Sequence, residues 1–228
     1  MDHFKDHHLR LNMLEADSIL LEYGGRKILQ NIYLKIEKGE IVGLLGRNGS
    51  GKSSLLQVIY GTRPAQNCSV RIDKTYVSKL YQQTNVAAYL PQRQFVPGYL
   101  KVSEALRLYK VPVEEAVSYF PELESILSQQ LDQLSGGQQR LIETIMVISC
   151  PAPFIMLDEP FSNLMPLHVE RIKAWLSVLK TSKGILISDH YYQDVLAMSD
   201  QVYLLSDGGR TILLQEPMKQ LRDFGYIY

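Results

Sequence analysis

The sequence predicts an α/β fold built on a mainly parallel sheet that is flanked by helices. Short, wholly apolar runs such as Ile41–Leu45 are typical of strands that are buried on both faces. Segments with apolar residues at helical spacing alternate with these runs, which favours parallel strands joined by helices. The chain has 228 residues, of which 46% are hydrophobic. That composition supports a buried core, and we expect a single domain over residues 1–228.

The N-terminal part predicts an antiparallel hairpin. Leu14–Tyr23 and Lys27–Glu37 have the composition of strands, and Gly24-Gly25 between them is typical of a turn. In the middle of the chain, Pro112 and Pro121 interrupt a helical pattern, because proline lacks the amide hydrogen that a helix interior needs. The expected elements after the first hairpin are, in order, a strand at Glu40–Leu45, helices at Ser53–Tyr60, Val102–Tyr109, Val113–Tyr119, Glu122–Gln130 and Gln138–Ser149, a strand at Phe154–Leu157, a helix at His168–Lys180 and a strand at Ile185–Ser188.

The C-terminal part predicts a second hairpin. Gln201–Leu205 and Thr211–Gln215 flank Asp207-Gly208-Gly209, which is a strong turn signal. The three short helices around the two prolines predict a small helical subdomain over about residues 95–140.

Composition excludes several classes of protein. Lysine and arginine balance aspartate and glutamate, so no net positive charge drives the chain toward nucleic acid. Cys68 and Cys150 lie far apart in the sequence and predict free thiols, which suit a reducing cytosol. The apolar runs are too short to cross a bilayer. We expect a cytoplasmic location. His3, His7 and His8 are expected to form a solvated end rather than a metal site.

A glycine-rich loop after the first buried strand predicts phosphate binding. Glycines let the backbone turn tightly and bring amide groups close to phosphate oxygens, and the following helix start adds positive potential. Lys52 supplies a cation for the β- and γ-phosphates of ATP, and the Ser53 hydroxyl can bind Mg²⁺. We call this segment the phosphate loop; it comprises Gly46, Arg47, Asn48, Gly49, Ser50, Gly51, Lys52 and Ser53.

Two adjacent carboxylates predict the catalytic and metal-binding groups. Phe154–Leu157 runs directly into Asp158 and Glu159, at the end of a strand where open parallel sheets bind ligands. We expect Asp158 to hold the magnesium ion and Glu159 to polarise the attacking water. An apolar run that ends in two acids is commonly just a strand end. The phosphate loop upstream favours the catalytic interpretation.

A third motif identifies a family. Leu134-Ser135-Gly136-Gly137-Gln138 predicts a helix start in which Ser135 caps the helix and the glycines expose amide groups. With this pentapeptide, here called the signature turn, the sequence resembles the ABC (ATP-binding cassette) ATPases. The resemblance implies that Ser135, Gly136, Gly137 and Gln138 contact the γ-phosphate of ATP held on an opposing subunit.

Further positions fit the same resemblance. Tyr23 matches the aromatic residue that stacks on adenine, and Gln92 matches the glutamine that contacts Mg²⁺ and the attacking water. His190 matches the histidine that contacts the γ-phosphate, and Ser54 follows the phosphate loop as a further nucleotide contact. Taken alone, a tyrosine at a strand end usually packs and an isolated histidine usually makes structural hydrogen bonds. Their order along the chain gives them weight.

The resemblance spans roughly residues 14–214 and implies a P-loop NTPase core, mainly a parallel sheet flanked by helices. It also implies an N-terminal antiparallel β-subdomain, over about residues 13–40 and part of 68–90, and the small inserted helical subdomain. The implied function is ATP hydrolysis that powers transport across a membrane. The implied partners are a second nucleotide-binding subunit, identical or different and paired head to tail, and transmembrane subunits that hold this chain at the membrane.

One position departs from the family pattern. After Glu159-Pro160 the family usually has an aspartate where this chain has Met165, and a thioether cannot make the charged hydrogen bonds of a carboxylate. Met165 favours one alternative that stays open, a regulatory subunit that senses nucleotide with slow turnover, although the intact Glu159 opposes it. The other alternative is a soluble ABC ATPase outside transport, which usually needs tandem cassettes or long coiled-coil insertions, whereas this chain shows one cassette and no sustained heptads. Phe95, Val96 and Tyr99 could offer an apolar docking surface to a membrane partner, or could pack within the subdomain.

Overall fold

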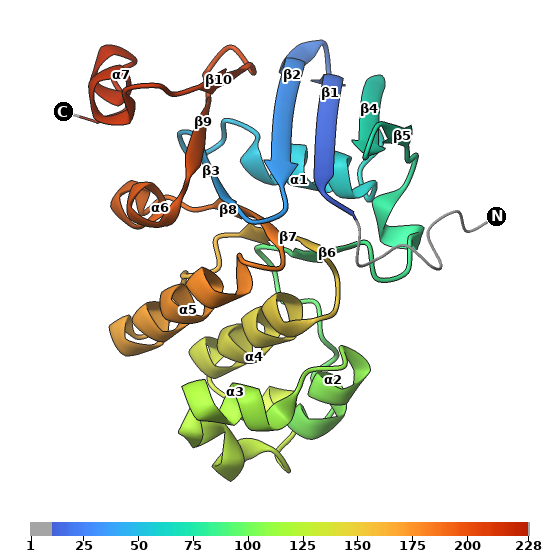
Figure 1. The fold of residues 1–228 in the computed structure, drawn as a ribbon, viewed down its shortest axis with the longest axis vertical. Coiled ribbons are helices and arrows are strands. Elements are labelled where there is room, and N and C mark those ends of the chain that lie inside the picture. Colours follow the sequence, from blue (N-terminus) through green and yellow to red (C-terminus); the bar gives the residue numbers. More distant parts are fainter. Residues whose placement is uncertain (1–10, 228) are drawn as a thin grey trace.

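The computed structural model describes residues 11–227, and these residues form two sheets with helices around them (Figure 1). His3, His7 and His8 lie outside the described residues. The larger sheet has the strand order β10-β9-β3-β8-β7-β6, and all its neighbouring strands are parallel except the β9–β10 hairpin. Its strands are β3 (Ile41–Leu45), β6 (Ala87–Leu90), β7 (Phe154–Asp158), β8 (Gly184–Ser188), β9 (Gln201–Leu205) and β10 (Thr211–Leu213).

The smaller sheet is antiparallel and has the order β2-β1-β4-β5. Strands β1 (Met13–Tyr23) and β2 (Arg26–Glu37) form the predicted hairpin, whose turn is at Gly24 and Gly25. The other two strands, β4 (Asn67–Ile72) and β5 (Thr75–Tyr76), come from the β-branched and aromatic segment that follows helix α1. The predicted fold class, a mainly parallel core with an N-terminal antiparallel sheet, is confirmed.

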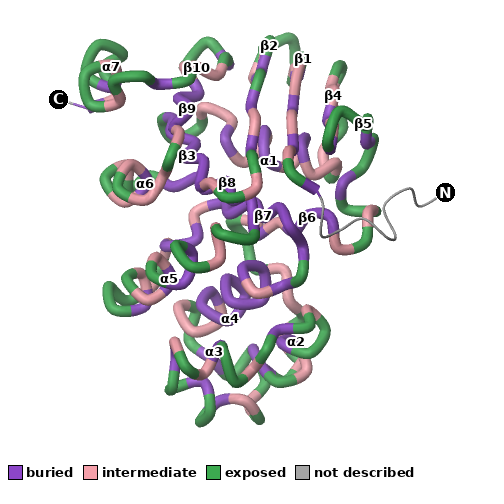
Figure 2. Tube along the Cα trace, viewed as in Figure 1, coloured by how far each residue is buried: buried purple, intermediate pink, exposed green. Residues whose placement is uncertain are grey.

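The central strands are buried on both faces and divide the core into two clusters (Figure 2). In β3, Ile41 and Leu45 belong to the cluster on the helical side, whereas Val42 and Leu44 face the antiparallel sheet. Because successive side chains of a strand point to opposite faces, the unbroken apolar run fills both clusters.

The helices cover the two faces unequally. Helix α1 (Lys52–Tyr60) packs between the two sheets, and the remaining helices contribute to the opposite cluster. Helix α4 is buried at every residue from Arg140 to Ile148, as its apolar residues on more than one face predict. The helices on that side are α2 (Val102–Leu108), α3 (Val113–Tyr119), α4 (Gly136–Ser149), α5 (Pro166–Leu179), α6 (Tyr192–Met198) and α7 (Pro217–Asp223).

Two predicted elements are shorter than expected by more than one residue. The helix predicted at Glu122–Gln130 is a 3₁₀ turn over Pro121–Ile126, because the carbonyls of Leu127 and Gln129 instead accept hydrogen bonds from Ser103 and Val102 at the start of α2. Strand β10 ends at Leu213 rather than Gln215. Among residues 11–227, no helix is long and apolar enough to span a membrane.

Candidate nucleotide-binding site

The carboxyl ends of four parallel strands meet at one edge of the larger sheet and open into a pocket. The phosphate loop follows β3, Gln92 follows β6, Glu159 follows β7 and His190 follows β8. This is the edge at which open parallel sheets bind ligands. The cavity has a volume of about 690 Å³, within the usual range for small-molecule sites. It is lined by Leu21, Tyr23, Ile28, Asn48, Gly49, Gly51, Lys52, Ser53, Ser54, Arg63, Gln92, Glu159 and His190.

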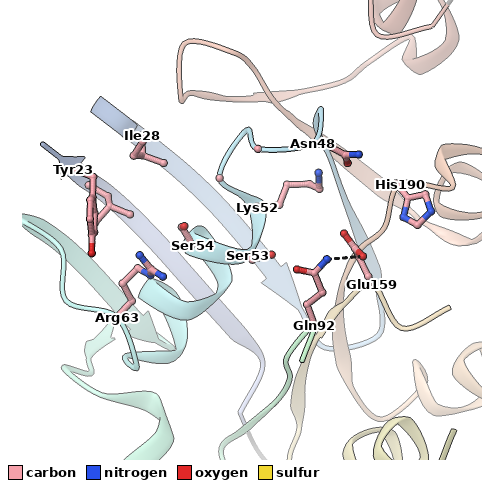
Figure 3. Close-up of a pocket in the computed structure, with 13 residues that line it drawn as sticks. Tyr23, Ile28, Asn48, Lys52, Ser53, Ser54, Arg63, Gln92, Glu159 and His190 are labelled. Atoms are coloured by element: carbon pink, nitrogen blue, oxygen red, sulfur yellow. Dashed lines mark hydrogen bonds between the residues drawn. The ribbon is translucent and has the colours of Figure 1, made fainter. Parts of the chain in front are cut away.

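The pocket is elongated and has two chemically different ends (Figure 3). Tyr23, Ile28 and Arg63 lie at one end, whereas Gln92, Glu159 and His190 lie at the other. Lys52 and the serines at the start of α1 lie between them. An aromatic and aliphatic end suits a nucleobase, and the polar end suits the phosphates.

The start of α1 is open to an anion. Gly51 caps the helix in the left-handed conformation, with φ of 104°, which favours glycine. No side chain accepts a hydrogen bond from the first turn. The amide groups of an α-helix start have no partner within the helix, and they carry the positive end of the helix dipole. The phosphate loop therefore offers donors and positive potential to a phosphate group.

Lys52 is folded back into the phosphate loop. Its side chain is 6% exposed, and Nζ donates to the carbonyls of Gly46 at 2.5 Å and Arg47 at 3.2 Å. Burial lowers the pKa of Lys52, and the nearby carboxylates, Glu159 first among them, oppose that shift. The ammonium group is thus held where phosphate oxygens could replace main-chain carbonyls as its partners.

Asp158 is the last residue of β7 and is 1% exposed. Its Oδ2 accepts a hydrogen bond from the Tyr89 hydroxyl at 3.2 Å, but Oδ1 has no hydrogen-bond partner within residues 11–227. Burial raises the pKa of Asp158, while the hydroxyls of Ser53 and Tyr89 lower it. A buried carboxylate oxygen without a donor, beside a serine hydroxyl, fits the oxygen ligands that Mg²⁺ prefers.

Glu159 has an unusual backbone conformation, with φ of 51°. A residue with a side chain rarely occupies the left-handed region, and such strain concentrates at functional sites. Its amide donates to the carbonyl of Ser188 at 2.6 Å, which ties β7 to β8. Its side-chain Oε2 accepts hydrogen bonds from Gln92 at 2.9 Å and from Ser162 at 3.3 Å. The carboxylate is therefore held in the pocket by two neighbouring side chains.

His190 follows a buried aspartate. The ring packs against that of Tyr191 at an interplanar angle of 38°, with centroids 4.1 Å apart, and Nδ1 lies 3.4 Å from Oδ1 of Asp189. Asp189 is fully buried, and it accepts hydrogen bonds from the amides of Tyr191 and Phe161. Burial raises the pKa of Asp189, whereas these amides and His190 lower it. The aspartate orients the histidine at the pocket edge, a partner that the sequence motif did not reveal.

Several pocket residues were not predicted from the sequence. Arg63 follows the end of α1, and its Nε donates to Oε1 of Gln57 at 2.8 Å. Leu21 and Ile28 come from the two strands of the first hairpin. These residues carry no motif of their own, so only the packing of the antiparallel sheet against α1 brings them to the cavity.

Some predicted residues lie outside the cavity lining. Gly46 contributes its carbonyl to Lys52, and Arg47 turns away to the carboxylate of Asp207 and the carbonyl of Gly225. The Ser50 hydroxyl is buried without a partner. Asp158 lies beneath the pocket rather than on its wall.

The signature turn is not part of this pocket. Ser135 caps α4: its hydroxyl accepts a hydrogen bond from the Gln138 amide at 3.3 Å, and the Gln138 side chain accepts one from the Ser135 amide at 3.0 Å. Ser135 and Gly136 are exposed, and Gly137 faces the carbonyl of Asn163. The three motifs thus form two separate surfaces on one chain.

Known proteins share this arrangement. A family model described as ABC transporter matches residues 29–162, more than half of the chain. The lipopolysaccharide export system ATP-binding protein LptB of Escherichia coli is 30% identical over 210 residues, covering 86% of this chain and 87% of that protein. A probable ABC transporter ATP-binding protein of Azorhizobium caulinodans is 29% identical over 216 residues, covering 89% of this chain and 76% of that protein.

Solved structures share the fold. The ATP-binding subunit of an ABC transporter superposes with a TM-score of 0.80 at 24% identity, covering 93% of both chains. A nucleotide-free ATP-binding cassette from an ABC transporter superposes with a TM-score of 0.74 at 24% identity, covering 93% of this chain and 96% of that chain. The relatives are ATP-binding subunits of transporters, which disfavours both the soluble ATPase and the nucleotide-sensing alternative. The chain therefore belongs to the ABC transporter family, as an ATP-binding subunit whose ATPase activity powers transport.

Proposed function

We propose that two cassettes meet head to tail and hold two MgATP molecules between them, each between the phosphate loop of one chain and the signature turn of the other. One observation carries this proposal: Lys52, Asp158, Glu159 and Gln92 converge on one edge of the sheet, with unpaired donors and acceptors that a nucleotide would use. The signature turn supports the dimeric half of the proposal, because Ser135 and Gly136 are exposed at its surface.

The chain's own residues bind ATP along the elongated pocket. Tyr23 stacks on the base, and the amide groups of the phosphate loop hold the β- and γ-phosphates. Lys52 exchanges its carbonyl partners for phosphate oxygens, which form stronger, charge-assisted hydrogen bonds. The open start of α1 stabilises the added negative charge.

Ser53, Asp158 and Gln92 are the residues that would hold magnesium. Ser53 and Asp158 offer hard oxygen ligands, directly or through water, and Asp158 has an oxygen with no other partner. When bound, Mg²⁺ neutralises phosphate charge and orients the γ-phosphate for in-line attack.

Glu159 is the proposed general base. Gln92 and Ser162 hold its Oε2, and Ser188 holds its amide, so that the carboxylate is oriented before substrate arrives. A water placed between Glu159 and the γ-phosphate would lose a proton to Glu159 as its oxygen bonds to the γ-phosphorus and the bond to the bridging oxygen breaks, releasing ADP. His190, oriented by Asp189, contacts the γ-phosphate.

Hydrolysis removes the γ-phosphate that both subunits hold. The closed dimer therefore binds ATP more tightly than ADP, and this difference in affinity drives the cycle of closing and reopening. If the second cassette is an identical copy, both sites contain the residues described here.

A membrane partner would dock beside the segment that follows Gln92, within the helical subdomain of about residues 95–140. Phe95 and Val96 are half-buried against the core, and their amides donate to Glu143. Tyr99 is 70% exposed. Tyr99 is thus the residue of this segment that can offer apolar surface to a partner, and such docking would keep the chain at the cytoplasmic face of the membrane.

The decisive experiment replaces the proposed base. Glu159→Gln keeps the size and the hydrogen bond to Gln92 but cannot accept a proton. We expect phosphate release to fall by at least about 100-fold, and an ATP-dependent dimer to accumulate in light scattering. Glu170→Gln, at an exposed position on α5, is the matched control. Full turnover by the Glu159→Gln protein would overturn the assignment of Glu159.

A further inference from the structure

Helix α4 carries a buried arginine one turn beyond the signature turn. Arg140 is 5% exposed, and its guanidinium donates hydrogen bonds to three main-chain carbonyls. Nη2 reaches the carbonyls of Asp158 at 2.6 Å and Glu159 at 2.9 Å, and Nη1 reaches that of Pro91 at 2.7 Å. Pro91 directly precedes Gln92. Each acceptor therefore belongs to, or adjoins, a residue proposed to act on the γ-phosphate or its magnesium ion.

The contacts restrain the strained residue of the site. Glu159 has a left-handed backbone, which persists only where surrounding bonds hold it. Ser188 accepts its amide hydrogen and Arg140 donates to its carbonyl, so both peptide groups of Glu159 are fixed. Arginine suits this task because its planar fork of donors can reach several acceptors in fixed directions.

The next turn of α4 holds the other side of Gln92. Oε1 of Glu143 accepts hydrogen bonds from the amides of Phe95 at 2.8 Å and Val96 at 3.1 Å. Arg140 and Glu143, which are three residues apart on α4, thus bind the chain on both sides of Gln92. Nη1 of Arg140 lies 4.0 Å from Oε2 of Glu143.

This cluster is not arranged for stability alone. Nε of Arg140 and Oε2 of Glu143 are both buried without a hydrogen-bond partner among the residues that the structure describes. Burial lowers the pKa of the guanidinium, and the carboxylates of Glu143, Asp158 and Glu159 oppose that shift. Buried charged groups with unmet bonding capacity reduce stability, and they are best explained by a functional requirement.

We propose that Arg140 is a positioning residue that joins the signature turn to the catalytic groups of its own chain. It fixes the backbone of Glu159 and the approach to Gln92. When a partner's nucleotide engages Ser135–Gln138, a shift of α4 passes through Arg140 to Glu159 of the same chain. This inference rests on the proposed head-to-tail dimer and on Glu159 as its base.

The test uses mixed dimers of the full chain, purified with two different tags. One subunit carries Lys52→Met, so that only the pocket of the other subunit hydrolyses ATP. Arg140→Met is then placed either in the subunit with the working pocket or in the Lys52→Met subunit. Methionine fills a similar volume without donors. We expect turnover to fall by about 10- to 100-fold only in the first arrangement, because a small displacement of the base is costly.

Further readouts separate positioning from folding. ATP affinity, measured by equilibrium binding, should change by less than about 3-fold, because Arg140 does not line the pocket. In homodimers of Arg140→Met, the cooperativity of hydrolysis with ATP concentration should also be lost. Arg140→Lys keeps the buried charge but lacks the fork, so it should fold if methionine does not, and it should recover only part of the rate. Arg171→Met, a partly exposed arginine on α5, is the control.

The outcomes distinguish the two levels of inference. Equal loss of turnover in both arrangements would show that Arg140 acts on the signature turn or on folding, and would overturn the proposed positioning role. Wild-type turnover and cooperativity in all Arg140 variants would overturn it as well. Activity of the Glu159→Gln protein would instead overturn the function on which the proposal depends.

Discussion

Helices α1 and α4 both begin in glycine-rich segments, but the first turns of the two helices are capped differently. Helix α1 begins after the phosphate loop with Gly51 as cap and no side chain to accept from its first turn. Helix α4 begins with a reciprocal capping box between Ser135 and Gln138. The amide groups at the start of α1 are left free for a ligand, whereas those at the start of α4 are partly used by the capping box.

The residues around the first turns of α1 and α4 show the same difference in how far their hydrogen-bonding groups are satisfied. Around α1, the hydroxyl of Ser50 and Oδ1 of Asp158 are buried without partners in the described part of the chain, and Nζ of Lys52 donates to two main-chain carbonyls. At α4, no atom of residues 11–227 outside the adjoining helix backbone lies within 4 Å of the position that a Cβ on Gly136 would occupy. The phosphate loop has hydrogen-bonding groups that a ligand bound to the same chain would use. The signature turn satisfies part of its own hydrogen bonds and leaves its surface exposed. The following predictions, from the largest expected effect to the smallest, test that contrast.

Substitutions at the starts of α1 and α4 should impair different steps, ATP binding and hydrolysis, and the two variants should complement each other. Lys52→Met should lower ATP affinity by about 10- to 100-fold, because it removes a charge-assisted bond. Gly136→Asp should leave ATP binding by the monomer intact, yet lower hydrolysis by about 100- to 1,000-fold in the dimer, because it brings negative charge to the γ-phosphate. Equilibrium binding and phosphate release measure the two effects.

Mixing the two inactive proteins provides the control. A mixed dimer has one site with an intact phosphate loop and an intact signature turn, so hydrolysis should return when the variants are combined. If the mixture stays inactive although mixed dimers form, the signature turn does not serve the neighbouring pocket.

The two glycines of the signature turn should differ in their effect on stability. A Cβ on Gly137 would lie 2.7 Å from the carbonyl oxygen of Asn163, whereas one on Gly136 would meet nothing. Gly137→Ala should therefore lower the free energy of unfolding by about 1–3 kcal/mol, because backbone must move to admit the methyl group. Gly136→Ala should change it by less than about 0.5 kcal/mol.

Chemical denaturation of the two alanine variants gives this comparison directly. Phosphate release should fall in the Gly136→Ala protein despite its normal stability, since the exposed glycine would face a partner's nucleotide. Equal stability of both variants would mean that the packing of Asn163 against the turn adapts freely.

Asp158 and the phosphate loop lack partners that bound MgATP would supply. We therefore expect Asp158→Asn to stabilise the nucleotide-free protein. Removing a buried charge with an unpaired oxygen should raise the free energy of unfolding by about 1 kcal/mol, or Tm by about 2–4 °C, while abolishing the stabilisation by MgATP. Asp223→Asn, at an exposed position, is the control.

The pH dependence of this difference has a defined sign. Burial raises the pKa of Asp158 above its ordinary value of 3.8, so the protonated form stabilises the fold below that value and the contribution is lost as pH rises through the folded pKa. The advantage of the asparagine variant should thus be largest at neutral pH and shrink as the solution is acidified. A constant difference across pH would contradict a buried charge as its cause.

A third helix start gives the smallest expected effect. Met165 occupies the cap position of α5, and no side chain caps that helix. Met165→Asp should stabilise the chain by about 0.5 kcal/mol, because an aspartate oxygen can accept from the amides of the first turn. Thermal unfolding of Met165→Asp beside Met165→Ala measures the gain. No difference between the two would show that the segment after Glu159 is already fixed by other contacts.

Much of the architecture could be predicted from local patterns. The apolar runs of β3 and β8, the turn at Gly24-Gly25 and the Asp207-Gly208-Gly209 hairpin follow from period, composition and turn chemistry, and the structure contains all of them. The segment after Pro121 was predicted as a longer helix because its spacing is helical. Its carbonyls are instead used by the start of α2, a competition that spacing cannot reveal.

The sequence by itself determined the motifs, their order and their chemistry, because phosphate binding needs glycines, a lysine and a serine at fixed positions in one short segment. Only the tertiary structure decided which motifs share a pocket and which stand apart. It brought Arg63 and Ile28 to the cavity, set Asp189 behind His190 and placed Arg140 under Glu159. Contacts between residues far apart in the chain depend on the packing of whole elements, and no local pattern encodes that packing.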